Sequence, residues 1–157
     1  MAGIRVIRPT DRDCNTAQTT GMTREAGVSE QTSGATTIWS GWVSTPPGLH
    51  SGAHHHGDCE TAIYVLKGRV RFYWGDKLQH HEDVQAGDFL YVPPNEVHVE
   101  ENLSDTEPVE FIVSRGCNGI LVVNVPDPRE TAAATGDKRK HSPRRHGGRG
   151  EVRGLSS

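Results

Sequence analysis

Short apolar runs separated by turn residues limit the fold of this chain more than any other feature. The runs recur roughly every eight to twelve residues and are rich in β-branched and aromatic side chains, as in small sandwiches and barrels. Arg69–Trp74 alternates cleanly, with Val70, Phe72 and Trp74 on one face. Because no segment has a strong helical period, we expect an all-β sandwich or barrel. The expected strands are residues 4–7, 36–43, 54–66 (one strand or two), 69–74, 77–84, 89–92, 97–101, 109–114 and 120–125.

The 157 residues suffice for one domain with irregular ends. Residues 1–34 form an N-terminal arm that begins with the short strand at 4–7 and continues as a polar irregular segment. Residues 35–128 form the barrel. Residues 129–157 contain almost no large apolar side chains, so they cannot bury enough surface to offset their ordering entropy. We expect a disordered, basic C-terminal tail.

Charge and cysteine usage limit the partners and the compartment. The net charge of −3 combines +5 on residues 129–157 with −8 on the rest, and an acidic body argues against nucleic acid as a partner. No apolar stretch is long enough to cross a membrane and no secretory signal is evident, so a cytoplasmic protein is expected. The three cysteines, Cys14, Cys59 and Cys117, form no CxxC motif and are interpreted as free thiols in a reducing compartment.

Four residues have the pattern of a metal site. His54 and His56 are two residues apart, so on a strand both imidazoles point to one face. Glu60 follows four residues later, and His98 comes from a distant predicted strand. Imidazoles with a carboxylate are ligands for divalent transition metals.

These residues resemble the two sequence motifs of the cupin family. The first motif, G-x5-H-x-H-x3,4-E-x6-G, matches at Gly48, His54, His56, Glu60 and Gly68. The second, G-x5-P-x-G-x2-H-x3-N, matches at Gly87, Pro93, His98 and Asn102. The resemblance implies a double-stranded β-helix, a jelly-roll-like barrel. It also implies that His54, His56, Glu60 and His98 hold one divalent metal: iron, manganese, cobalt, nickel, copper or zinc.

Two positions depart from the motifs. Seven residues separate Glu60 from Gly68 where the family has six, so counting back from Gly68 puts the carboxylate position at Thr61. Either a one-residue bulge keeps Glu60 at the metal, or the site has three histidines and no carboxylate. Asn95 replaces the second glycine of the second motif, and asparagine tolerates a left-handed turn well.

Neighbouring residues receive supporting roles. His55 is expected to point away from His54 and His56. Tyr64, Phe72 and Trp74 are candidates for the pocket wall, although aromatic residues in such positions more often belong to the core. Cys59 is interpreted as a buried thiol, and Glu100–Glu101 as a solvated face.

The resemblance implies a metalloenzyme that acts on a small organic molecule, of the oxygenase, isomerase, decarboxylase or lyase type. One alternative is a non-catalytic small-molecule-binding, sensor or accessory protein. Another is an accessory protein of the polyketide cyclase type. Cupins of this size often pair, so a homodimer formed through an exposed strand edge is expected, with residues 1–34 covering or exchanging that edge.

Overall fold

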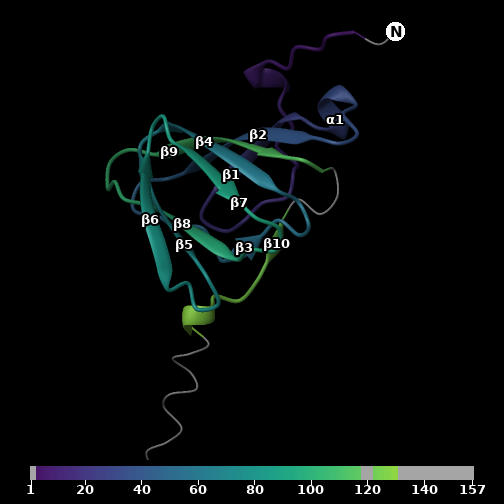
Figure 1. Cartoon of the computed structure of the whole chain (residues 1–157). Coiled ribbons are helices and arrows are strands. Elements are labelled where there is room, and N and C mark those ends of the chain that lie inside the picture. Colours follow the sequence, from purple (N-terminus) through teal and green to yellow (C-terminus); the bar gives the residue numbers. More distant parts are fainter. Residues whose placement is uncertain (1–2, 118–121, 131–157) are drawn as a thin grey trace, which may run out of the picture.

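The structure is a computed structural model in which residues 3–117 and 122–130 are described. Two five-stranded sheets face each other, with strand orders β1-β2-β9-β4-β7 and β10-β3-β8-β5-β6 (Figure 1). All assigned strand pairs are antiparallel. The strands are β1 (Thr23–Val28), β2 (Trp39–Thr45), β3 (His54–His55), β4 (Thr61–Lys67), β5 (Arg69–Trp74), β6 (His80–Gln85), β7 (Phe89–Val92), β8 (His98–Asn102), β9 (Val109–Arg115) and β10 (Val123–Asn124). A 3₁₀ turn, η1 (Pro9–Asp11), and a short helix, α1 (Glu30–Ser33), precede β2.

The predicted all-β class and the double-stranded β-helix are confirmed, and β5 and β7 have the expected bounds. The strand predicted at residues 4–7 is wrong, because Ile4 is fully exposed and the segment has no strand partner. Part of the expected irregular arm, Thr23–Val28, instead forms β1 and pairs with β2. Of the strand predicted at 120–125, residues 120 and 121 lie outside the described residues, as does nearly all of the predicted tail.

The inner faces of the sheets are apolar toward one end and polar toward the other. Phe72 of β5 packs edge-to-face against Phe111 of β9, and the surrounding core is made mainly of valine and isoleucine. Toward the other end the buried side chains include histidines, a glutamate and two arginines. Buried charged groups are rare unless they are paired or bind something, so the polar end is the place to look for a site.

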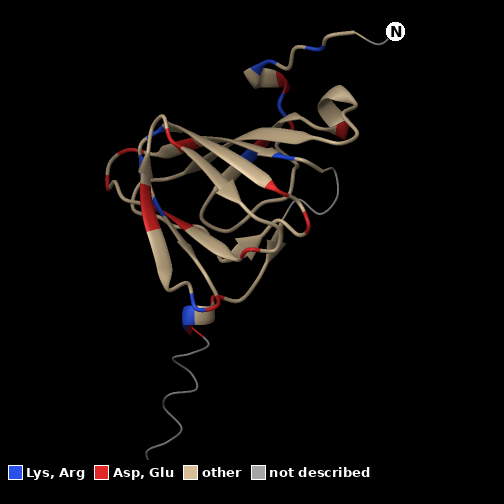
Figure 2. Ribbon diagram, viewed as in Figure 1, with Lys and Arg blue, Asp and Glu red and all other residues tan. Residues whose placement is uncertain are grey.

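The outer surface of the second sheet is polar at its edge and covered near its centre. Acidic residues Glu82 and Asp83 lie on the edge strand β6 (Figure 2), where Asp83 pairs with Arg69 and Arg71. Charged edge strands resist pairing with other chains. The C-terminal segment reaches back over this sheet, since Val125 packs in a small cluster with Tyr73 and Val99, and the Arg129 Cζ lies 5.3 Å from the centre of the Tyr73 ring. In the part of the chain that the structure describes, no helix is long and apolar enough to cross a bilayer.

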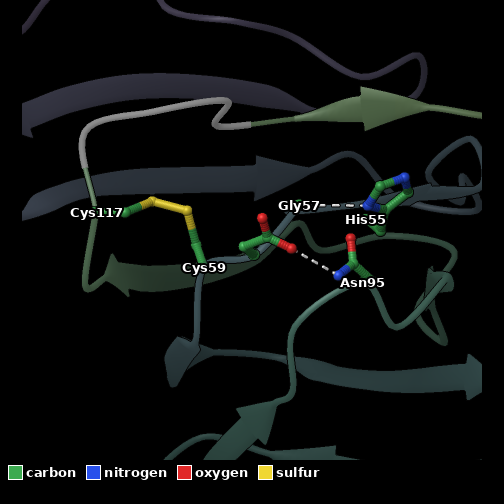
Figure 3. Close-up of a disulfide and its surroundings, with 6 residues drawn as sticks. His55, Gly57, Cys59, Asn95 and Cys117 are labelled. Atoms are coloured by element: carbon green, nitrogen blue, oxygen red, sulfur yellow. Dashed lines mark hydrogen bonds between the residues drawn. A yellow bond between two sulfur atoms is a disulfide. The ribbon is translucent and has the colours of Figure 1, made fainter.

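A disulfide joins Cys59, just before β4, to Cys117, just after β9 (Figure 3). The interpretation of these two residues as free thiols is therefore wrong, and only Cys14 is a free, exposed cysteine. The antiparallel pairing of β4 with β9 brings the two Cα atoms to 5.8 Å, within the range that a disulfide requires. Because the two cysteines are 58 residues apart in the sequence, their proximity could not be predicted from it. A disulfide favours an oxidising compartment rather than the reducing one expected from the cysteine count.

The turn before β8 also bears on the site. Asn95 adopts the left-handed conformation, with φ of 60°. Its backbone N–H donates to the Gly57 carbonyl at 2.7 Å, and its side-chain amide donates to Asp58 at 2.9 Å (Figure 3). Asparagine thus serves in place of the motif's glycine and ties the two motif loops together.

Candidate metal centre

Three histidines from the two motifs meet inside the barrel. His54 of β3 lies directly opposite His98 of β8 in the strand pairing, so their side chains share a face. His56 follows β3 two residues after His54. The three are 0%, 3% and 2% exposed, and one ring nitrogen from each lies within 4.8 Å of the others. This spacing suits convergence on a single ion.

Backbone carbonyls orient two of these rings. Nδ1–H of His54 donates to the Gly52 carbonyl and Nδ1–H of His98 to the Glu96 carbonyl, each at 2.9 Å. Because a carbonyl only accepts, each Nδ1 carries a proton, so in the neutral form of each ring the lone pair is on Nε2. Nε2 of His98 is buried and has no hydrogen-bond partner among the described residues. An imidazole held in this way is the usual arrangement of a metal ligand, so the residues present fit a metal ion.

The electrostatics keep His54 in its ligating form. Burial is the main cause that lowers the pKa of His54 to about 3, and the nearby His98 and Arg24 act in the same direction, while Glu100 opposes them. A neutral imidazole is the form that binds metals. Arg24 of β1 has its Nη2 3.2 Å from His54 Nε2, and it also donates to Thr19. A metal on His54 Nε2 would replace the hydrogen bond from Arg24.

A buried carboxylate, that of Glu100, lies beside the histidines. Its Oε1 lies 3.9 Å from His54 Nε2 and 3.8 Å from His98 Nε2, and its Oε2 accepts a hydrogen bond from Ser51 at 2.6 Å. Burial by itself raises the pKa of Glu100, but electrostatic interactions with His54, His98 and Arg24 and the Ser51 hydrogen bond together hold it below its ordinary value. The expectation that Glu100 is solvated is therefore wrong. The two-residue period from His98 already pointed to it, since residues 98, 100 and 102 share one face of β8.

Glu60 does not join this group. It is exposed, and its Oε1 accepts a hydrogen bond from the Tyr91 hydroxyl at 2.9 Å. Thr61 starts β4 and points inward instead, 1% exposed. From Thr61 to Val65 the pairing with β9 is regular, so no bulge turns Glu60 toward the histidines. The geometry matches the alternative of a site with three histidines and without Glu60. Thr61 occupies the position counted back from Gly68.

A cavity of about 370 Å³ opens beside His98. Phe72 and Trp74, two of the candidate wall residues, line it together with residues of β6 and β7. Tyr64, the third, is not in the wall: β4 turns Thr61, Ile63 and Val65 inward, so Tyr64 faces outward and packs on Phe89 at 4.7 Å between ring centroids.

His55 also turns away from the cluster. Its Nδ1 accepts the Gly57 N–H at 3.1 Å, in the loop drawn in Figure 3. This is the orientation that strict alternation from His54 predicts.

The fold and these residues define a class: a double-stranded β-helix protein with a group of three histidines that could bind a metal ion. Residues 41–115 match a family model described as the cupin domain, so this part of the chain is a cupin domain.

Solved structures agree on the fold. Oxalate decarboxylase from Bacillus subtilis is similar at 25% identity over 76% of this chain and 33% of its own, with a TM-score of 0.59. The polyketide cyclase RemF from Streptomyces resistomycificus is similar at 21% identity over 83% of this chain and 94% of its own, with a TM-score of 0.64. The chain thus spans about a third of the length of the decarboxylase. A comparison with curated protein sequences finds no match.

Proposed function

We propose that this cupin binds one divalent transition metal through His54, His56 and His98 and is a metalloenzyme acting on a small organic molecule. The observation that carries the proposal is the convergence of three buried imidazoles, two of them oriented by backbone carbonyls. Iron, manganese, cobalt, nickel, copper and zinc all accept such donors.

The metal would supply a Lewis acid that polarises a bound oxygen and leaves coordination positions open to substrate. The chain supplies the surroundings. Ser51 holds Glu100 so that Oε1 faces the histidines and can accept a proton from a bound molecule. Phe72 and Trp74 give the approach to His98 an apolar wall, which lowers the local dielectric and strengthens charge interactions within.

Metal analysis of variants tests the ligand set. The purified wild-type protein should hold one equivalent of metal, measured by plasma mass spectrometry after dialysis. His98→Ala and His56→Ala should each lose most of it, because each removes a donor. Glu60→Gln is the matched control and should retain wild-type content, since Glu60 bonds to Tyr91 instead. Loss of metal in Glu60→Gln together with retention in His98→Ala would contradict the proposal.

A turnover assay distinguishes catalysis from simple binding. Protein reconstituted with each metal should convert a member of a panel of catechols, diketones, amino acids and carboxylic acids. Ligand-induced thermal stabilisation without turnover under any metal would assign the second candidate, a non-catalytic binding or accessory protein. That candidate is favoured by the position of Glu60 outside the cluster, since no motif carboxylate is then at the metal.

Two further expectations stay predictions. A homodimer would form through a sheet edge, and β7 at the edge of the first sheet exposes Phe89 and Tyr91. Light scattering that gives a monomer at high concentration would refute it. A cytoplasmic location is the weaker expectation, because the Cys59–Cys117 disulfide favours an oxidising compartment.

A further inference from the structure

Three polar side chains form a row across the inner face of the first sheet. Arg115 of β9 pairs with Trp39 of β2 on one side and with Thr61 of β4 on the other. Residues opposite each other in antiparallel strands share a face, so the three side chains are neighbours. All three are nearly fully buried.

The row is rich in hydrogen-bonding atoms without partners. Trp39 Nε1, Thr61 Oγ1 and both Nε and Nη1 of Arg115 are buried, and none has a hydrogen-bond partner among the described residues. An indole and a guanidinium can only donate. Buried polar groups in folded proteins are almost always satisfied, so these donors call for an acceptor that the described residues do not supply.

The net charge of the buried side chains also favours a bound anion. Arg115 and Arg24 are buried cations that interact electrostatically with each other and with Glu100, the buried carboxylate beside the histidines. Burial is the main cause that lowers the pKa of Arg115 to about 9, which leaves it protonated at neutral pH. Two guanidinium groups against one carboxylate leave one positive charge, before any metal ion is counted. A bound group with a single negative charge would balance it.

The sheet holds the guanidinium in place. Its Cζ lies 4.6 Å from the centre of the Trp39 ring, and that ring lies over Gly41. A Cβ at residue 41 would come to 2.5 Å from the Trp39 ring and from the Glu25 carbonyl oxygen, so glycine leaves the space that the indole occupies. Stacking fixes the orientation of Arg115 in advance, which reduces the entropy lost when an anion binds.

We propose that Arg115, Trp39 and Thr61 form a carboxylate-binding subsite of the barrel interior, and that the natural ligand is a small organic acid. The inference rests on the proposed function in one respect: the rest of the acid would face the metal held by the three histidines. The position that the cupin motif reserves for a carboxylate is Thr61. Here a neutral side chain beside a guanidinium would receive the carboxylate of the ligand instead.

Calorimetric titration of the full chain tests the subsite, with zinc-loaded and metal-free protein run in parallel. The probes are acetate and oxalate, their neutral analogues acetamide and oxamide, and inorganic phosphate. Wild-type protein should bind the acids and not the amides. Arg115→Met, which keeps the volume and removes the charge, should weaken acid binding at least tenfold. Arg115→Lys should recover part of the loss. Arg69→Met removes an arginine whose side chain is 63% exposed and should change nothing.

The Trp39→Phe variant tests the subsite with Arg115 intact, so the proposal can be tested even if the arginine variants fail to fold. It keeps a ring under Arg115 and removes the Nε1 donor together with part of the indole, so acid binding should weaken severalfold while circular dichroism stays unchanged. Equal acid binding by wild type and Arg115→Met, equal binding of acid and amide, or tighter binding of phosphate would overturn the carboxylate subsite. If no metal binds but acids bind in an Arg115-dependent way, the metal proposal fails and the subsite stands. If metal binds but acids do not, the subsite proposal fails and the metal proposal stands.

Discussion

Reduction of the Cys59–Cys117 disulfide should cost this protein a large part of its stability. The two residues are separated by 58 positions. Closing a loop of that length in the unfolded chain removes entropy equivalent to about 4 kcal/mol at 25 °C. Domains of this size are stable by only about 5–15 kcal/mol, so the reduced protein should be marginal.

Urea unfolding followed by tryptophan fluorescence measures this loss. With a slope of about 2 kcal/mol per molar urea, the midpoint should fall by about 2 M on reduction. The double variant Cys59→Ser with Cys117→Ser should behave like the reduced protein. Cys14→Ser is the matched control and should leave the midpoint unchanged, because Cys14 is exposed and unpaired.

The reasoning fails if the oxidised and reduced proteins unfold at the same urea concentration with the same slope. That result would mean that the bond does not form in solution or that the reduced chain holds β4 and β9 together equally well. Mass spectrometry of the unreduced protein separates the two explanations, since the disulfide lowers the mass by two hydrogens.

Three other outcomes follow from the structure. Iodoacetamide applied to the unfolded, unreduced protein should label Cys14 alone, and labelling at three positions would refute the pairing. Gly41→Ala should destabilise by about 1–3 kcal/mol in urea unfolding, because its Cβ would meet the Glu25 carbonyl oxygen and the Trp39 ring, each at 2.5 Å. Gly27→Ala is the control, with only the Ser40 carbonyl near, at 3.4 Å. In chelator, the unfolded chain protonates His54 at its ordinary pKa of 6.5 and the folded chain only near 3. The free energy of unfolding should therefore fall by up to about 1.4 kcal/mol per pH unit between these values as the pH drops, and His54→Asn should flatten this dependence.

Most of the correct predictions from the sequence came from the alternation of side chains along single strands. This alternation placed β5 correctly, and it put His54 and His56 on one side with His55 on the other, whereas β7 was predicted from a short apolar run between turn residues. The same period, applied from His98, would have placed Glu100 inside. Treating Glu100 and Glu101 as one acidic surface pair was the error, since neighbours on a strand face opposite ways.

The pairing of strands that are distant in the sequence could not be predicted from local alternation. Arg24 and Arg115 are buried because β1 and β9 lie in the first sheet, and nothing local to either residue marks it as interior. The disulfide depends on the β4–β9 register in the same way. The segment at residues 4–7 shows the converse: β-branched residues favour a strand, but a strand forms only where a partner is available.

The opposition of His54 and His98 across β3 and β8 has a consequence for biosynthesis. A growing chain that has displayed only the first motif offers two of the three imidazoles, and it cannot enclose an ion until the strand carrying His98 has emerged and docked. If the three imidazoles bind a metal as proposed, its capture would be a late event, and the barrel would then close over side chains that are hardly exposed. The ion found in the mature protein would record which metals surrounded the chain while it folded, more than which one the three imidazoles bind most tightly.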